Sequence, residues 1–173
     1  MDKLLVVVDM QIDFITGSLG TSEARGIVPR VVEKVKHALR HKSTVVYTMD
    51  THEEDYLETL EGRNLPVKHC IYGTDGWELI PELRGLLSEL SQFRKPTFGS
   101  MALAMEYQKK HFSEIELCGV CTDICVVSNA LLLRAALPDT RIVVDSSATA
   151  GSTIEAHKAA LLVMKQNHID VLE

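Results

Sequence analysis

The sequence predicts an α/β protein with three layers, α/β/α, built around a six-stranded, mostly parallel sheet. Short β-branched runs alternate with amphipathic helical stretches, a pattern typical of βαβ units. The clearest run, residues 4–8, is continuously apolar, which is expected for a strand covered on both faces. The length of 173 residues is enough for one domain with a substantial core. We therefore expect a single domain over residues 1–173.

The predicted strands are short and follow one another along the chain. They span residues 3–9, 43–49, 90–95, 114–119, 141–145 and 170–172. The predicted helices lie between them, at residues 23–40, 77–90, 101–110, 122–137 and 153–167. In the first helix, Ile27, Val31 and Val35 recur at helical spacing, and Thr153 is a suitable N-cap for the last.

Composition and charge exclude several classes of protein. The chain is 46% hydrophobic, which rules out intrinsic disorder, and its apolar runs are far shorter than a bilayer crossing. The net charge is −6, and the basic residues are scattered, so we expect neither nucleic acid nor membrane as a partner. A strand-like run begins at Lys3 and leaves no room for a signal peptide, so we expect a cytoplasmic protein with four reduced cysteines.

Three reactive side chains stand near predicted strand ends. Asp9 closes the first strand, Lys95 closes the third, and Cys125 follows the glycine turn after the fourth. The carboxyl ends of parallel strands share one edge of a sheet, so the three groups are expected to meet there. Each residue alone has a more ordinary role, as a turn former, a solvated lysine or a core thiol. Together, a thiol, a carboxylate and an ammonium are the equipment for nucleophilic acyl transfer.

Two segments resemble motifs of a known family. Residues 7–14 (VVDMQIDF) are similar to the opening strand and turn of the isochorismatase-like cysteine hydrolase superfamily. Residues 119–126 (GVCTDICV) resemble its nucleophile motif, G-[VL]-x-[ST]-[DN]-x-C-V, and the motifs are closest to those of nicotinamidases and pyrazinamidases. The resemblance runs from residue 4 to residue 171. It implies the isochorismatase-like hydrolase fold, with Cys125 as nucleophile, Asp9 as general base and acid, and Lys95 as the third member of a triad.

The resemblance also implies the surroundings of the nucleophile. A cis peptide bond between Val120 and Cys121 is expected, with the amides of Cys121 and Cys125 forming an oxyanion hole. Phe14 and Cys121 are expected to line the substrate pocket. Family members that cleave vinyl ethers have no cysteine at the nucleophile position, so Cys125 argues against isochorismatase chemistry itself.

A long polar connection at residues 50–76 carries a candidate metal site. Asp50 and His52 occupy alternate positions of an extended segment, and His69 lies downstream. Carboxylate and imidazole ligands suit Zn²⁺, Mn²⁺ or Fe²⁺, although an acidic loop with two histidines is also compatible with simple solvation. Nicotinamidases have an Asp-x-His…His site here with His or Glu as the remaining ligand. No histidine lies between His52 and His69, so the resemblance implies a glutamate, for which Glu61 aligns better than Glu58.

The resemblance therefore predicts hydrolysis of a small-molecule carboxamide, with nicotinamide as the leading substrate, a divalent metal and no organic cofactor. The segment 96–100 departs from the Tyr-Ser-Ala-Phe-like sequence of nicotinamidases, which leaves another small amide or ureido compound as an alternative substrate. A non-catalytic redox or metal-binding protein using Cys121 and Cys125 is a second alternative, but their spacing is not that of a Cys-x-x-Cys motif. The family also implies a homo-oligomer, either a dimer or a tetramer.

Overall fold

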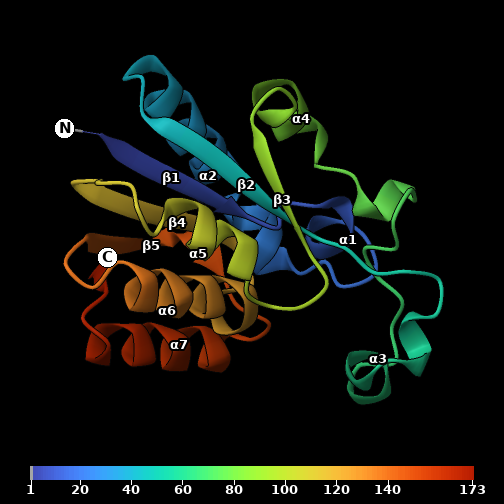
Figure 1. The fold of residues 1–173 in the computed structure, drawn as a ribbon. Helices are drawn as coiled ribbons and strands as arrows, with labels where there is room; N and C mark the ends of the chain where they lie inside the picture. Colours follow the sequence, from blue (N-terminus) through green and yellow to red (C-terminus); the bar gives the residue numbers. More distant parts are fainter. Residues whose placement is uncertain (1) are drawn as a thin grey trace.

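The computed structural model describes residues 2–173 and contains one parallel sheet of six strands (Figure 1). The strands are β1 (Lys3–Val8), β2 (Thr44–Asp50), β3 (Ser91–Lys95), β4 (Glu114–Val120), β5 (Arg141–Ala150) and β6 (Asp170–Leu172). Their order is β3-β2-β1-β4-β5-β6, and every neighbouring pair is parallel. The predicted six-stranded sheet is confirmed.

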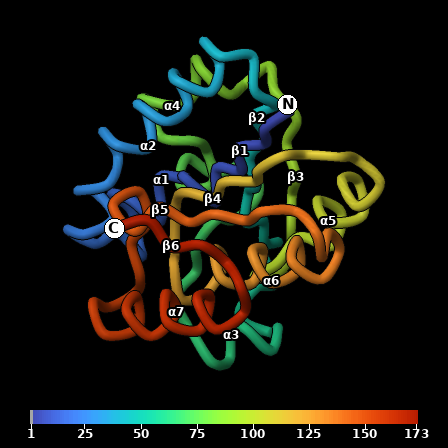
Figure 2. Tube along the Cα trace, turned by 90° about the vertical axis from the view of Figure 1, so that its left-hand side faces the viewer, coloured from blue at the N-terminus to red at the C-terminus, as the bar shows by residue number. Residues whose placement is uncertain are grey.

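Helices cover both faces of the sheet. The α-helices of the described chain are α1 (Ile12–Ile15), α2 (Ser22–Arg40), α3 (Leu60–Asn64), α4 (Pro81–Leu87), α5 (Met101–Tyr107), α6 (Val127–Ala136) and α7 (Ile154–Gln166), of which α3 lies in the long loop. Figure 2 shows α2 and α4 on one side of the sheet and α5, α6 and α7 on the other. This arrangement confirms the three-layer architecture. No helix within residues 2–173 is both long and apolar enough to cross a membrane.

The continuous apolar run of β1 supplies both halves of the core. Leu5 and Val7 pack into the cluster that includes Val31 and Val35 of α2, whereas Val6 belongs to the cluster on the opposite face. Successive side chains of a strand point to opposite faces, so a central strand with a helical layer on each side is apolar at every position.

The strand order places a topological switch point beside β1. The chain moves outward from β1 through β2 to β3, then returns to place β4 on the other side of β1. Open α/β sheets bind ligands at the carboxyl ends of the strands where the order reverses. The ends of β1 and β4, which carry Asp9 and the Cys125 turn, lie at this point.

The three largest differences from the predicted boundaries have identifiable reasons. The helix expected at residues 77–90 begins at Pro81, because proline fits the first turn of a helix and Trp77 ends a separate short turn. The strand expected to end at residue 145 continues to Ala150, because its ladder with β4 resumes after a register shift. The helix expected from residue 122 starts with a π-helical turn, Thr122–Val126, before α6.

Candidate active site

The structure brings the three predicted triad residues together. The Nζ of Lys95 lies 2.6 Å from Oδ2 of Asp9 and 3.4 Å from Sγ of Cys125. The three side chains are buried: the residues are 0%, 1% and 4% exposed for Asp9, Lys95 and Cys125. β2 lies between β3 and β1, and neighbouring strands are about 4.8 Å apart. Lys95 therefore reaches across two strand spacings, which its long side chain allows.

Burial and charge set the protonation of the triad. Burial raises the pKa of Asp9, and the Lys95 ammonium opposes this only in part. Burial acts to lower the pKa of Lys95, but the charges of Asp9, Cys125 and Asp50 hold it well above its usual range. Burial, followed by the Asp9 charge, raises the pKa of the Cys125 thiol well above its usual value. The thiol therefore keeps its proton unless a neighbouring base accepts it.

The turn that carries Cys125 depends on a glycine and a tight backbone. Gly119 has φ +114°, and a Cβ at this position would lie 2.1 Å from the carbonyl oxygen of Val8. The peptide bond between Val120 and Cys121 is cis. The Cys121 carbonyl accepts the N–H groups of Ile124 and Val126, at 3.1 and 3.0 Å, and so starts the π-helical turn. Cys121 is half-buried next to the nucleophile turn, and burial raises its pKa to about 12.

Two supporting residues were not identified from the sequence. Thr48 of β2 donates a 2.6 Å hydrogen bond from Oγ1 to Oδ1 of Asp9. Asn129 of α6 donates from Nδ2 to the carbonyls of Cys125 and Phe98 and accepts the Ser100 N–H. Both lie within apolar stretches of sequence. A polar residue in such a stretch is expected to be buried and hydrogen-bonded, and this was the signal that could have indicated them.

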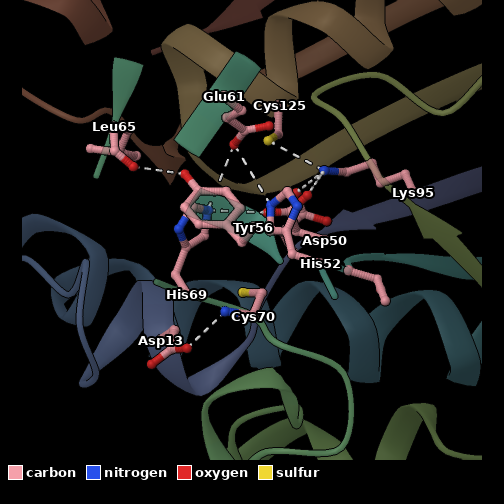
Figure 3. A network of polar contacts seen from close by, with 12 residues as sticks. Asp13, Asp50, His52, Tyr56, Glu61, Leu65, His69, Cys70, Lys95 and Cys125 are labelled. Atoms are coloured by element: carbon pink, nitrogen blue, oxygen red, sulfur yellow. Dashed lines mark hydrogen bonds and ion pairs between the residues drawn. The ribbon is translucent and has the colours of Figure 1, made fainter. Parts of the chain in front are cut away.

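A second group of side chains, drawn in Figure 3, adjoins the triad. One ligand atom from each of Asp50, His52, Glu61 and His69 lies within 4.8 Å of all the others. Oδ2 of Asp50 lies 3.0 Å from Nε2 of His52 and 3.5 Å from Nε2 of His69, and Oε1 of Glu61 lies 3.7 Å from each Nε2. Glu58 is not a member of the group. The structure thus brings together the four residues that the sequence singled out.

The donor set of this group fits a divalent transition metal. Two imidazole nitrogens and two carboxylate oxygens match the preferences of Zn²⁺, Mn²⁺ and Fe²⁺. Nδ1 of His69 faces the Val67 carbonyl at 2.8 Å, a contact that leaves Nε2 to face the group. Burial opposes the ionisation of Asp50, but the hydrogen bonds from His52 and His69 lower its pKa. Burial and the Asp50 charge raise the pKa of Glu61, so a cation here would offset like charges.

The long loop is anchored to α1 and braced by contacts within itself. Oδ2 of Asp13 accepts the backbone N–H of Cys70 at 2.8 Å, next to His69 (Figure 3). The hydroxyl of Tyr56 donates to the Leu65 carbonyl at 2.9 Å, and the Tyr56 ring packs on both histidine rings of the group. The Phe14 ring lies 5.6 Å from the His69 ring, so Phe14 is a neighbour of the candidate metal group.

Asp50 links the two groups. Its Oδ1 lies 3.2 Å from Nζ of Lys95, while its Oδ2 faces the two histidines. The triad and the candidate metal group therefore form one continuous buried polar site at the carboxyl edge of the sheet.

Comparisons with known proteins identify the class of protein that this fold and site define. Residues 3–173 match the isochorismatase domain, and the chain belongs to the isochorismatase family. An isochorismatase family protein of Bacillus subtilis is 31% identical, over 93% of each chain.

Solved structures share the whole fold. A pyrazinamidase of Pyrococcus horikoshii in complex with zinc superposes with a TM-score of 0.86 at 26% identity, over 100% of this chain and 99% of that one. A nicotinamidase of Bacillus subtilis gives 0.86 at 27% identity, over 100% of both chains. An N-carbamoylsarcosine amidase of Thermoplasma acidophilum gives 0.83 at 27% identity, over 100% of this chain and 96% of that one.

Proposed function

We propose that the protein is a cysteine-dependent amidohydrolase that converts nicotinamide to nicotinate and ammonia. The observation that carries this proposal is the single ammonium of Lys95, which contacts both the Asp9 carboxylate and the Cys125 sulfur in a buried site. Family membership and the similarity to a nicotinamidase and a pyrazinamidase support the amide substrate.

The reaction begins when Asp9 accepts the thiol proton of Cys125. The sulfur then attacks the carboxamide carbon, and the amides of Cys121 and Cys125 stabilise the oxyanion. Asp9 returns the proton to the departing nitrogen, ammonia leaves, and a thioester remains on Cys125. Asp9 next takes a proton from water, the hydroxide attacks the thioester, and the C–S bond breaks to release the product acid, which ionises to the carboxylate. Asp9 then returns its proton to the Cys125 sulfur and restores the thiol. Lys95 stays charged throughout and stabilises the negative charge that moves between Asp9 and Cys125.

The candidate metal would be held by Asp50, His52, Glu61 and His69. When bound, such an ion supplies a Lewis acid that can hold a pyridine nitrogen or a water molecule. Phe14, beside His69, and Cys121, beside the nucleophile turn, are proposed to line the substrate pocket.

A ureido compound or another small amide is the second candidate substrate. The similarity to an N-carbamoylsarcosine amidase favours it, as does the segment 96–100, which differs from nicotinamidases and exposes 42% of Phe98. We further propose that the protein is cytoplasmic and forms a homo-oligomer, a dimer or a tetramer. Light scattering on the purified protein would test the oligomeric state.

The test is ammonia release from nicotinamide, pyrazinamide, and a panel of aliphatic amides and ureido acids. Cys125→Ala is expected to abolish release, whereas Cys118→Ala, which removes a buried thiol in the same strand–turn segment, is expected to retain it. Activity that survives in Cys125→Ala would refute the mechanism. Preference for a ureido acid over nicotinamide would select the second candidate, and full activity after thorough chelation would refute a role for the metal.

A further inference from the structure

We propose that Thr48 is a positioning residue that determines which oxygen of Asp9 carries the proton during turnover. The inference rests on the proposed function of Asp9 as the base and acid of an amidohydrolase. Thr48 lies in β2, is fully buried, and has no place in the motifs that identify the family.

The hydroxyl of Thr48 has a fixed direction. Its oxygen accepts the backbone N–H of Asp9 at 3.3 Å, and its single proton is donated to Oδ1 of Asp9 at 2.6 Å. A hydroxyl has one donor, and here that donor is used by the carboxylate. Because both contacts are made to one residue, Thr48 holds the Asp9 backbone and side chain together.

The two oxygens of Asp9 therefore differ. Oδ1 accepts the hydrogen bond of the Thr48 hydroxyl, so a proton bound to Oδ1 would compete with an existing donor. Oδ2 lies 2.6 Å from the Lys95 ammonium as an ion pair, yet it is a buried atom without a well-aligned hydrogen-bond donor among residues 2–173. The same ammonium lies 3.4 Å from the Cys125 sulfur, so Oδ2 and the sulfur are joined through one lysine.

The proton transfer then has one defined course. The S–H bond of Cys125 breaks, its electron pair stays on sulfur, and an O–H bond forms at Oδ2 of Asp9. When the C–N bond of the substrate breaks, that O–H bond breaks too, and the proton passes to the leaving nitrogen, which departs as ammonia. Without Thr48, a proton can settle on Oδ1, and the carboxylate, having lost a donor, holds it more tightly.

The experiment compares Thr48→Val, Thr48→Ala and Thr48→Ser with wild type and Thr44→Val. Thr44 belongs to the same strand and is exposed, so it controls for the effect of the substitution on β2. Thr48→Val and Thr48→Ala are expected to lower kcat for amide hydrolysis by at least about tenfold with KM unchanged, which is the loss of one buried hydrogen bond in the transition state. Thr48→Ser keeps the hydroxyl and is expected to restore kcat to within about threefold.

The rate of Cys125 alkylation by iodoacetamide provides a second readout, independent of amide turnover. Cys125 is expected to be alkylated faster in Thr48→Val and Thr48→Ala than in wild type, because Asp9 holds the thiol proton more tightly. A damaged site would instead lower turnover without raising the rate of alkylation. Wild-type kcat in Thr48→Ala, an equal loss in Thr48→Ser, or unchanged alkylation would each overturn the proposal. Absence of amide hydrolysis in the wild type would refute the proposed function instead, and the alkylation rates would still decide the role of Thr48.

Discussion

Asn129 is the buried side chain whose removal tests most directly how the nucleophile is supported. It joins three backbone groups: the carbonyl of Cys125 at 2.8 Å, the carbonyl of Phe98 at 3.3 Å and the N–H of Ser100 at 2.9 Å. Asn129→Leu keeps a similar side-chain volume but removes all three hydrogen bonds. The change therefore separates hydrogen bonding from packing.

The magnitude follows from the burial of those partners. Cys125 and Ser100 are 4% and 2% exposed, so their groups have no access to water, whereas Phe98 is 42% exposed and its carbonyl can be hydrated. Each buried group left unpaired costs roughly 1–3 kcal/mol, so the free energy of unfolding is expected to fall by about 2–6 kcal/mol. This is a large share of the typical total of about 5–15 kcal/mol.

The assay is urea denaturation at 25 °C, read by circular dichroism, with ammonia release measured well below the unfolding transition. Asn167→Leu is the matched control, because Asn167 is exposed and donates to a single helical carbonyl at 2.8 Å. A fall in the free energy of unfolding of less than about 1 kcal/mol relative to this control would refute the reasoning that Asn129 satisfies two buried groups.

Three further predictions concern the metal group, a buried ion pair and the remaining thiols. Glu61→Gln is expected to weaken zinc binding at least about tenfold in calorimetric titration, whereas Glu58→Gln leaves it unchanged; equal effects would contradict the assignment of Glu61. Lys34 lies 2.6 Å from both Glu116 and Asp145, and Lys34→Met is expected to lower the free energy of unfolding at pH 7 by about 1–3 kcal/mol. Burial opposes ionisation of Asp145, but the hydrogen bond from Lys34 lowers its pKa in the folded protein. The stability that Asp145 contributes is therefore present above its unfolded pKa, near 3.8, and is lost as the pH falls through its folded pKa. The difference in the free energy of unfolding between Lys34→Met and wild type should accordingly disappear at acid pH. A difference that persists there would contradict this explanation. Burial raises the pKa of Cys70 and Cys118, so both thiols should resist iodoacetamide in the folded protein and react only after urea unfolding. Mass spectrometry would detect the labelled residues. Labelling of either thiol at the rate of Cys125 would show that burial does not protect it.

Much of the fold could be predicted from the sequence, because the signals that specify it are local. The apolar run at residues 4–8 identifies a strand buried on both faces, and α2 carries apolar residues at helical spacing. Boundaries were less predictable, because pairing with a neighbouring strand extends β5 by five residues beyond its predicted end at residue 145. Such pairing depends on a partner distant in the chain.

The candidate site was predictable to the extent that topology carries side chains to one edge. Asp9, Lys95 and Cys125 stand at or just after strand ends, so a parallel sheet is enough to place them together. Glu58 and Glu61 could not be separated by spacing alone, because both lie in the same polar loop. The fold of α3 directs Glu61 toward the two histidines.

The sequence by itself determined the family, the parallel sheet and the set of reactive groups, because motifs and hydrophobic periodicity are properties of neighbouring residues. The tertiary structure decided how those groups are connected. Lys95 reaches across β2 to Asp9, Asp50 serves both the lysine and the histidines, and the Thr48 hydroxyl meets Oδ1 of Asp9. The contacts of Lys95 with Asp9 and Asp50, and of Thr48 with Asp9, join residues about 40 or more positions apart, and their energies depend on burial that exists only once the layers have packed.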